Sequence, residues 1–335
     1  MTKVSIVLPF KNSSRTLGEC INSILRQNLN HWELIGIDDH STDSSFSIFE
    51  AFSKGDKRIT ILKNPGDGIV DSLNFGIKKA RTQLIARMDA DDIMHPQRLF
   101  LQVERLERKQ ELGLISCLVN HVPIGDHDTR GYQKYVHWIN KICSTREISL
   151  NRFIESPFAH PSVVFRRELV SAYGGYRKGD FPEDYELWLR FLNEGVQMEK
   201  VNNYLLDWRD SKQRTSRTGS NYKLGAFQNV KSIYLKEWID KMIPANKSVH
   251  AWGAGKFAKQ QIKYLNKIGI SVDCSYDIDP KKIIKGEKVF HINKIPKPEH
   301  CFIICLVGKD DTRDKITEFL SKKGYIIEKD FIFAA

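Results

Sequence analysis

Long apolar runs are absent from this sequence of 335 residues. No stretch approaches the roughly 20 apolar residues that an α-helix needs to cross a bilayer. The apolar segment at residues 3–10 is short, contains Pro9 and is followed at once by polar residues, unlike the core of a secretory signal peptide. We therefore expect a cytoplasmic protein, either free or attached peripherally at the inner membrane face.

Paired cysteines are also absent. The cysteines form no C-x-x-C pair, and no histidine stands at zinc-finger spacing from them, which argues against a structural zinc site or a redox motif. We expect buried free thiols in a reducing compartment. The cysteines concerned are Cys20, Cys117, Cys143, Cys274, Cys301 and Cys305.

A long run of one charge sign is missing as well, although the net charge is +11. A basic surface attracts nucleic acid, anionic membranes or phosphorylated substrates. The lysines of the C-terminal part are scattered and form no basic arm, so we expect a solvated surface and no nucleic-acid partner. A phosphorylated substrate and peripheral docking on anionic lipid stay open.

The sequence does contain a regular alternation of predicted strands and helices. β-branched apolar runs predict the strands, and apolar residues at helical spacing predict the helices between them. Such alternation predicts an α/β fold with a mostly parallel sheet flanked by helices. The predicted strands are 4–8, 33–37, 59–62 and 83–88, and the predicted helices are 17–25, 44–52 and 69–81, with another beginning near Pro96.

The length suggests two domains. Residues 207–223 are basic and hydroxyl-rich without apolar periodicity, and we interpret them as a mobile loop. A helical stripe returns at 224–243, and a linker at 244–248 leads into a second α/β pattern. The predicted division is therefore a large domain at 1–223, a connecting helix and linker at 224–247, and a small α/β domain at 248–335.

Acidic side chains stand directly after two predicted strands: Asp38 and Asp39 after the second, and Asp89, Asp91 and Asp92 after the fourth. Ligands of parallel sheets bind beyond the carboxyl ends of the strands. The cluster around Asp91 suits a hard divalent cation such as Mn2+ or Mg2+. The alternative is that Asp92, and likewise the pair after the second strand, cap the helices that follow.

A second acidic pair, Glu183 and Asp184, stands at the start of a predicted helix. Acids in this position either complement the helix dipole or, held on a rigid helix end, act as a general base. The basic residues of 207–223 are either solvated or fold over an anionic diphosphate. They are Arg209, Lys212, Arg214 and Arg217.

These motifs resemble those of the family-2 inverting glycosyltransferases with the GT-A fold. Each motif alone is weak, but the same six in the same order over residues 4–208 are specific. They are Val7-Leu-Pro-Phe-Lys-Asn12, Asp38-Asp-His-Ser-Thr-Asp43, Gly68 with Asn74 and Gly76, Ala86-Arg-Met-Asp-Ala-Asp-Asp92, His160-Pro-Ser-Val-Val-Phe-Arg-Arg167, and Gly174-Gly-Tyr176 leading into Glu183-Asp184.

The resemblance implies how the donor nucleotide is held. It places Pro9 and Asp39 at the nucleobase and Asp89 near the ribose. Further donor-side residues are expected at Phe10, Gly68 and Asn74.

The resemblance also implies the reacting groups. Asp91, together with Asp89, would bind the Mn2+ or Mg2+ ion that bridges the donor diphosphate. Asp184 would be the catalytic base and Glu183 its neighbour, and direct attack without a covalent intermediate would invert the anomeric configuration. His160 is expected on the acceptor side, and Arg209 and Arg214 are expected to face the phosphates. Relatives often carry a histidine soon after this arginine, whereas here Arg209 is followed by Asp210 and Ser211.

A glycine motif opens the predicted C-terminal domain. After a strand at 249–252, Gly253-Ala-Gly-Lys-Phe-Ala258 matches the G-x-G-x-x-A pattern of dinucleotide sites, and Asp277 follows at the distance of a ribose-binding acid. Gly253, Gly255 and Asp277 are thus a candidate second nucleotide site. The remaining roughly 90 residues are too few for a two-halved dinucleotide domain. A small Rossmann-like module with a packing or assembly role, including oligomerisation, is favoured.

Together these features predict a metal-dependent inverting glycosyltransferase. Its donor is expected to be a nucleoside-diphosphate sugar, with a UDP-sugar favoured, and its acceptor a glycan or lipid-linked hydroxyl in surface polysaccharide or glycan assembly. The alternative is a nucleotide-sensing or assembly protein with an inactive glycosyltransferase-like domain, against which the complete acid set at 39, 89, 91 and 184 argues. An oxidoreductase acting through the C-terminal glycines is weaker, because no catalytic His/Lys arrangement accompanies them.

Overall fold

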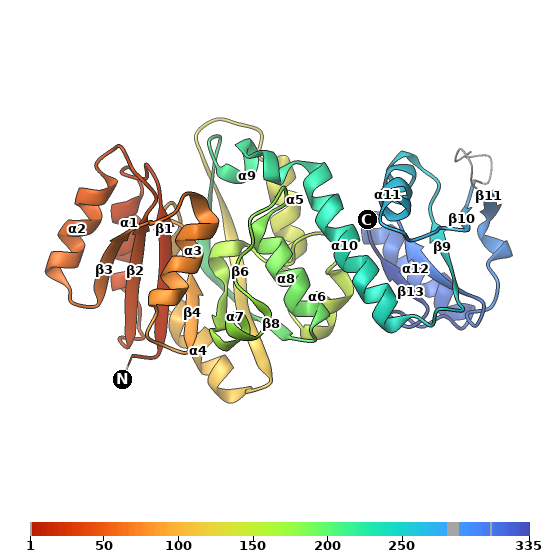
Figure 1. Cartoon of the computed structure of the whole chain (residues 1–335), viewed down its shortest axis with the longest axis horizontal. Helices are drawn as coiled ribbons and strands as arrows, with labels where there is room; N and C mark the ends of the chain where they lie inside the picture. The colour runs from red at the N-terminus through yellow and green to blue at the C-terminus, as the bar shows by residue number, and fades with distance from the viewer. Residues whose placement is uncertain (1, 280–287, 309) are drawn as a thin grey trace. The chain divides into compact units, whose positions relative to one another are not determined.

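The computed structural model describes residues 2–279, 288–308 and 310–335 (Figure 1). The chain forms two compact units, each described here by itself. The first contains Met1–Ile148 and Pro157–Tyr222, and the second contains Ser149–Ser156 and Lys223–Ala335. Within the described ranges, no helix is both long enough and apolar enough to cross a membrane.

An eight-stranded sheet organises the first unit, in the order β3-β2-β1-β4-β7-β6-β8-β5. The strands predicted near the N-terminus are confirmed as β1 to β4, with β1 parallel to both β2 and β4 and β2 parallel to β3. Beyond β4 the sheet becomes mixed, because β7 is antiparallel to β4 and β6, and β5 is antiparallel to β8. The strands are β1 (Val4–Phe10), β2 (Trp32–Asp38), β3 (Ile59–Lys63), β4 (Leu84–Arg87), β5 (Ile93–Met94), β6 (Leu112–Ile124), β7 (Val164–Arg166) and β8 (Gln197–Ser211).

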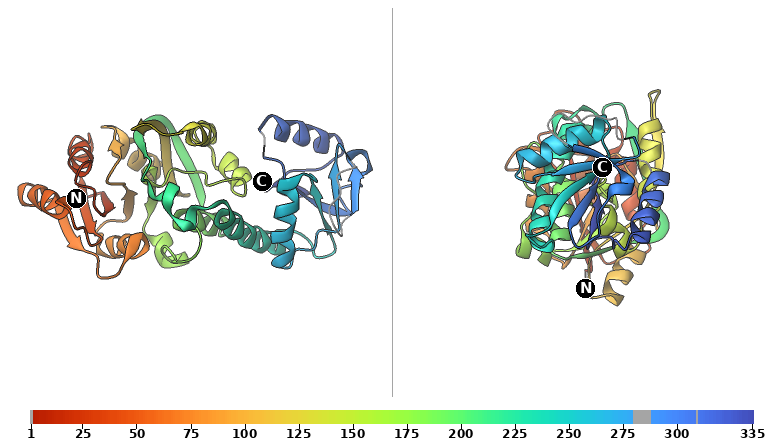
Figure 2. Two further views of the ribbon diagram at one scale, coloured as in Figure 1. Left: turned by 90° about the horizontal axis from the view of Figure 1, so that it is seen from above. Right: turned by 90° about the vertical axis from the view of Figure 1, so that its right-hand side faces the viewer.

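Helices cover both faces of this sheet (Figure 2), which explains why β1 and β2 are buried along their whole length. Alternate β1 residues point to opposite faces: Ile6 packs in the core with α1, α2, α4 and α5, and Val7 packs in the core with α3, α7 and α8. Gly76 of α3 lets that helix approach β1 closely, since a Cβ there would lie 2.5 Å from the Val7 side chain. The helices are α1 (Leu17–Leu25), α2 (Ser45–Gly55), α3 (Gly68–Lys79), α4 (Arg98–Arg108), α5 (Arg130–Ile139), α6 (Thr145–Asn151), α7 (Glu168–Tyr173), α8 (Glu183–Asn193) and α9 (Thr215–Thr218), with the 3-10 turns η1 (His160–Ser162) and η2 (Ser220–Tyr222).

The prediction of a loop throughout 207–223 is wrong in its first part and incomplete in the rest. Strand β8 continues to Ser211 and pairs with β6 up to Ile124, which satisfies the backbone of a segment without apolar periodicity. Within residues 207–211 the buried side chains are Trp208 and Asp210. The charge of the buried Asp210 carboxylate is compensated by hydrogen bonds with Arg217 and His121. The remaining residues form the short helices α9 and η2.

A five-stranded parallel sheet organises the second unit, in the order β11-β10-β9-β12-β13. This matches the strand order of the first five strands of doubly wound dinucleotide-binding sheets. Helix α12 packs in the core on one face, while α10 and α11 pack together on the other (Figure 2). The elements are α10 (Leu224–Met242), β9 (Ser248–Trp252), α11 (Lys256–Lys267), β10 (Cys274–Asp277), β11 (Lys288–His291), η3 (Ile292–Lys294), β12 (Cys301–Cys305), α12 (Asp310–Lys322) and β13 (Phe331–Phe333).

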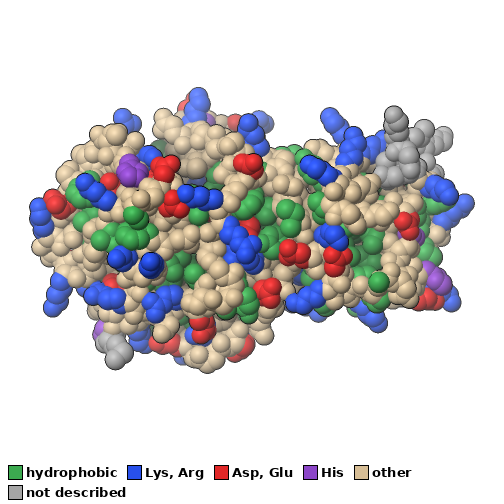
Figure 3. All heavy atoms as spheres, in the orientation of Figure 1, with side chains coloured by type: hydrophobic (Ala, Val, Ile, Leu, Met, Phe, Trp, Pro, Cys, Tyr) green, Lys and Arg blue, Asp and Glu red, His purple; other side chains and the backbone are tan. Residues whose placement is uncertain are grey.

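The thiols and the surface charge agree with the sequence in most respects. The six cysteines are all free, and all are buried except Cys143, which is only partly buried. On the face drawn in Figure 3, Lys and Arg side chains are interspersed with Asp and Glu side chains. That face therefore has the mixed charge of an ordinary solvated surface.

Candidate active site

The acid cluster lies directly beyond the carboxyl end of β4. Asp89, Asp91 and Asp92 each offer a carboxylate oxygen, and these oxygens lie within 4.8 Å of one another. Asp92 is fully buried; its Oδ1 accepts a hydrogen bond of 2.8 Å from the Arg209 backbone N–H, whereas its Oδ2 has no partner among the described residues. Burial and the neighbouring carboxylates raise the pKa of both Asp91 and Asp92. A divalent cation would relieve this repulsion and satisfy the orphaned oxygen, so the residues present fit such an ion.

The alternative role of Asp92 as a helix cap is wrong. Helix α4 begins at Arg98 with Gln97 as its N-cap residue, and no side chain makes a capping hydrogen bond there. Asp92 instead connects the acid cluster to β8, because its carboxylate accepts a hydrogen bond from the backbone N–H of Arg209. This strand comes more than a hundred residues later in the chain.

A buried arginine that we did not single out from the sequence lies beside the cluster. Arg87, at the end of β4, is 2% exposed and donates from Nη2 to Asp89 Oδ1 at 2.5 Å. Its positive charge also lowers the pKa of Glu183 and Asp184, against the larger effect of their burial. Arg87 therefore links the acid cluster to the predicted catalytic pair. The signal in the sequence that could have identified Arg87 is a charged residue inside the apolar run of a buried strand.

The two arginines predicted to face the phosphates lie differently. Arg214 stacks on Trp208, 4.0 Å from the ring centroid, and donates to the Arg209 carbonyl. Burial lowers the pKa of the Arg214 guanidinium, because it disfavours the charged form. The negative charges of Asp92, Asp91 and Asp89 have a larger combined effect, so the pKa is raised. Arg209 directs its own guanidinium to Glu19 of α1. Of these two arginines, Arg214 is therefore the one whose charge acts on the acid cluster, in addition to Arg87.

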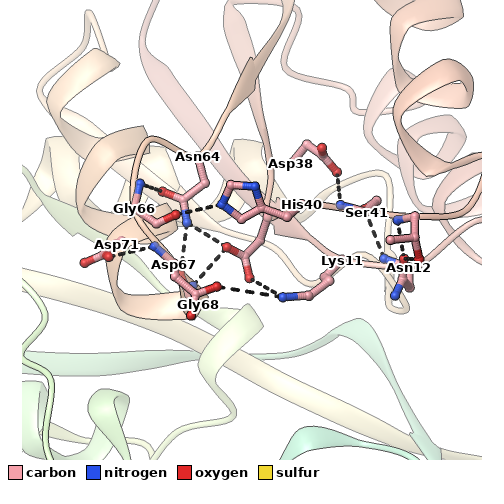
Figure 4. A network of polar contacts seen from close by, with 12 residues as sticks. Lys11, Asn12, Asp38, His40, Ser41, Asn64, Gly66, Asp67, Gly68 and Asp71 are labelled. Atoms are coloured by element: carbon pink, nitrogen blue, oxygen red, sulfur yellow. Dashed lines mark hydrogen bonds and ion pairs between the residues drawn. The ribbon is translucent and has the colours of Figure 1, made fainter.

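The predicted nucleobase acid, Asp39, is held by the turn between β3 and α3. Figure 4 labels Asn64, Gly66 and Gly68 of this turn. Asp39 Oδ1 accepts hydrogen bonds from Asn64 Nδ2 at 2.7 Å and from the Gly68 backbone N–H at 2.9 Å. Gly68 has a φ of +83°, which a residue with a side chain rarely adopts. Asp39 Oδ2 faces Lys11 Nζ at 3.4 Å. Asn64 and Lys11 are further site residues that the sequence did not reveal.

A second group of candidate metal ligands, Asp39, His40 and Asp67, lies in the same network. The His40 ring bonds to the Gly66 carbonyl at 2.8 Å, and Lys11 Nζ lies 4.0 Å from Asp67 Oδ1. Because an ammonium group already balances these carboxylates, we assign no metal to this group.

Two other predicted donor-side residues are engaged within the protein. The Phe10 ring is buried and stacks on Phe49 with centroids 5.2 Å apart, while its carbonyl accepts from the Asp39 N–H. The Asn74 side chain bonds to both the N–H and the carbonyl of Tyr176, at 3.0 and 2.9 Å. Pro9 lies within β1, opposite Ile37 of β2.

The predicted catalytic pair begins α8. Glu183 is 5% exposed and accepts a hydrogen bond of 2.6 Å from the Tyr222 hydroxyl. His160 Nδ1 lies 3.8 Å from the other Glu183 oxygen, and its Nε2 pairs with the Tyr176 hydroxyl at 2.8 Å. Burial lowers the pKa of His160 well below its usual value, so this ring is neutral at physiological pH. His160 therefore lies beside Glu183, near the carboxylate oxygen that Tyr222 does not contact.

Asp184 is only partly buried, in contrast to its neighbour. Its Oδ1 accepts from the Tyr185 backbone N–H at 2.7 Å. Burial, followed by the negative charge of Glu183, raises the pKa of Asp184 to about 8. A carboxyl with its pKa near the working pH is well suited to accept a proton.

The candidate second nucleotide site of the C-terminal part has its acid occupied by backbone. Asp277 Oδ2 accepts from the Ala254 N–H and Oδ1 from the Asp279 N–H, each at 2.9 Å. Gly253 has a φ of +113° and Gly255 is the N-cap residue of α11, as the fingerprint requires. Asp277 thus closes the glycine turn, and a bound nucleotide stays a prediction.

Comparison with known proteins gives a consistent family assignment. The profile of glycosyl transferase family 2 matches residues 5–174. A relative from Escherichia coli, the UDP-Gal:alpha-D-GlcNAc-diphosphoundecaprenol beta-1,3-galactosyltransferase, is 30% identical over 219 residues, covering 64% of this chain and 76% of its own.

Two solved structures share the fold at low sequence identity. Staphylococcus aureus TarS 1–349 in complex with UDP-GlcNAc aligns with a TM-score of 0.56 at 16% identity, over 71% of this chain and 67% of TarS. The mannosyltransferase PcManGT from Pyrobaculum calidifontis, in complex with GDP-Man and Mn2+, aligns with a TM-score of 0.51 at 16% identity, over 72% and 65%. This chain therefore belongs to glycosyl transferase family 2 and is a glycosyltransferase of the GT-A fold.

Proposed function

We propose that this enzyme transfers a sugar with inversion from a nucleoside diphosphate, preferably UDP, to an acceptor hydroxyl in the presence of Mn2+ or Mg2+. The observation that carries this proposal is that Arg87 interacts with two separate acidic groups. Asp89 binds its guanidinium, and the pair at Glu183 and Asp184 lies within its electrostatic reach. The group around Asp89 is suited to bind a cation together with a diphosphate. The pair at Glu183 and Asp184 is suited to accept the proton of an acceptor hydroxyl.

Asp89 and Asp91 are the proposed metal ligands, with Asp92 beside them. Bound there, a divalent ion would neutralise the charge that develops on the leaving diphosphate. Arg214 supplies a second positive charge at the same place, held rigidly by its stacking on Trp208. Arg209 is the less suitable of the two arginines, because its side chain is paired with Glu19.

Asp184 is the proposed base. Both Glu183 oxygens have neighbours, Tyr222 and His160, whereas Asp184 is partly accessible and holds a raised pKa. Asp184 would take the proton from the acceptor hydroxyl as the oxygen attacks the anomeric carbon, and the nucleoside diphosphate would leave from the opposite face. One displacement without a covalent enzyme intermediate inverts the configuration.

Asp39 is the proposed partner of the nucleobase. Its Oδ1 is already occupied by Asn64 and Gly68, so Oδ2 would accept a base N–H. Because the turn around Gly68 holds the carboxylate in place, this recognition needs little reorganisation on binding. A uracil N–H is the preferred partner, and Asp89 would lie near the ribose.

The acceptor is proposed to be a growing glycan or a lipid-linked sugar, as in the E. coli galactosyltransferase whose name specifies a diphosphoundecaprenol acceptor. Peripheral attachment to the inner membrane face would bring the site to such an acceptor. Residues 248–335 are proposed to form a small Rossmann-like domain with an assembly role, which includes oligomerisation.

Release of nucleoside diphosphate tests the proposal. Wild-type protein is incubated with UDP-galactose, UDP-glucose, UDP-GlcNAc or GDP-mannose plus Mn2+, with and without an extract of lipid-linked oligosaccharides, from pH 6 to 9.5. We expect UDP release that depends on Mn2+ and rises with pH through about 8, because Asp184 must lose its proton to act. Tight UDP binding with no release from any donor would favour the alternative of a nucleotide-sensing protein.

A further inference from the structure

The hydroxyl of Tyr222 makes a contact that the proposed mechanism does not use. Tyr222 ends η2, within the segment between β8 and α10, and donates to Glu183 Oε2 at 2.6 Å. The tyrosine is partly buried, and its backbone N–H bonds to the Gly219 carbonyl. Burial, reinforced by the charge of Glu183, raises the pKa of the Tyr222 hydroxyl above its usual range. The hydroxyl therefore keeps its proton and acts as a donor.

Glu183 is surrounded by groups from several elements, and among the side chains that the structure describes Tyr222 donates a short hydrogen bond to it. The His160 ring is neutral and lies 3.8 Å away. Arg87 acts on Glu183 through its charge while its hydrogen bond goes to Asp89. The titratable or charged groups facing Glu183 are Tyr222 from η2, His160 from η1, Tyr176 from the segment before α8, Arg87 from β4, Asp89 just after β4, and Asp184 on its own helix.

Glu183 is buried and its neighbour Asp184 is partly buried, and two adjacent carboxyls in such surroundings cannot both ionise easily, so a hydrogen bond to one of them decides where the charge resides. Burial raises the pKa of Glu183, and the Tyr222 hydroxyl opposes this effect through its 2.6 Å hydrogen bond, which stabilises the ionised form of Glu183. The negative charge of Glu183 in turn keeps the proton on Asp184 to higher pH. A base with a higher pKa takes a proton from a sugar hydroxyl more effectively. Tyr222 thus acts on the reaction through Glu183, without touching the reacting atoms.

We propose that Tyr222 is a positioning residue of the transfer site, whose hydroxyl fixes Glu183 as the ionised member of the acidic pair and leaves Asp184 to take the proton of the acceptor. This inference rests on the proposed function of Asp184 as the base. According to this inference the polar segment 212–222 has two functions: Tyr222 acts on the acidic pair, and Arg214 stabilises the leaving diphosphate.

The first test measures the acidic pair without turnover. Full-length protein with 13C-labelled Asp and Glu carboxyls is titrated by NMR in the presence of a chelator, and the two resonances are assigned with Glu183→Gln and Asp184→Asn. In Tyr222→Phe we expect the apparent pKa of Glu183 to rise by about one pH unit and that of Asp184 to fall. Tyr204→Phe is the matched control, because Tyr204 is 53% exposed. Unchanged titration of both carboxyls in a folded Tyr222→Phe protein overturns the proposal.

The second test follows UDP release from a UDP-sugar with Mn2+ as a function of pH. In Tyr222→Phe we expect the acid limb of kcat to move to lower pH by about one unit, with the plateau reduced about threefold and the KM for the donor unchanged. A lower rate with the same acid limb would assign a merely structural role to the tyrosine and refute the inference. If instead Asp184→Asn keeps full activity, the assignment of Asp184 as the base fails. The NMR titration still decides whether Tyr222 controls the pKa values of Glu183 and Asp184, because it does not depend on turnover.

Discussion

Arg87 and Asp89 form a buried ion pair at the end of β4, with Nη2 2.5 Å from Oδ1. The guanidinium is almost completely buried, and its Nε has no partner among the residues described. A buried charge of this kind is stable only while its neighbours compensate it. The pair therefore connects the stability of the fold with the state of the proposed metal site.

Replacing Arg87 by Met should leave the acid cluster without its internal cation. We expect Arg87→Met to lower the free energy of unfolding of the first unit by about 3 kcal/mol, since one partner of a buried pair is lost. Saturating Mn2+ should restore part of this loss, because the added ion compensates the same carboxylates. Urea unfolding with Mn2+ and with chelator checks both expectations, and an equal loss under the two conditions would separate Arg87 from the metal site.

Asp184→Asn should stabilise the protein at alkaline pH while abolishing transfer. The folded-state pKa of Asp184 is about 8, above its ordinary value of 3.8, so the fold favours the protonated carboxyl. Its contribution to stability is therefore complete below about pH 4 and is lost as the pH rises toward 8. We expect the variant to melt about 2–5 °C above wild type at pH 8.5 and with no difference at pH 4. A lower melting temperature for the variant at pH 8.5 would contradict the raised pKa.

Much of this site follows from the sequence because it lies where strands end. β1, β2 and β4 are short apolar runs, and the acids directly after β2 and β4 must come to one edge of a parallel sheet. Asp184 was also predictable, since an acid at a helix start after Pro182 is a local signal.

The remainder depends on contacts between segments far apart in the chain. Asp92 reads as a helix cap in isolation, but it meets the backbone of Arg209 across the sheet. Phe10 reads as a donor contact, but Phe49 of α2 takes its ring into the core. In the sequence alone Asp210 is interpreted as a loop residue. The pairing of β6 with β8 places Asp210 in a strand, and His121 of β6 binds its buried carboxylate. Local patterns carry no information about such partners.

Among the residues that the structure describes, two groups of side chains meet the geometric condition for a cation, one around Asp67 and one around Asp91, and variants should separate them. We expect Mn2+ to raise the melting temperature of wild type and of Asp67→Asn, but not that of Asp91→Asn. Asp67 is largely exposed and lies near the ammonium of Lys11, whereas Asp91 lies between other carboxylates. Differential scanning fluorimetry with Mn2+ and with chelator provides the measurement. Loss of the Mn2+ effect in Asp67→Asn alone would move the metal to the other group.

Asp39→Asn should weaken nucleotide binding without changing the metal site. The amide that replaces the carboxylate cannot accept a base N–H as strongly, and it disturbs the bonds from Asn64 and Gly68. We expect the affinity for UDP to fall about tenfold to a hundredfold, as for the loss of a charged hydrogen bond. Calorimetric titration with UDP and Mn2+ measures the effect, and Asp128→Asn, at an exposed position, is the control. Unaltered UDP affinity would remove Asp39 from the donor site.

We propose that Asp39, Asp91 and Asp184 serve a single transfer site. The most direct measurement is a crystal structure with UDP and Mn2+, in which anomalous scattering locates the ion. We predict one Mn2+ bound by Asp91 and a diphosphate oxygen, with the uracil N–H on Asp39 and Asp184 facing the sugar position beyond the diphosphate. An ion bound away from Asp91, or a UDP whose diphosphate does not reach the acid cluster, would contradict the account.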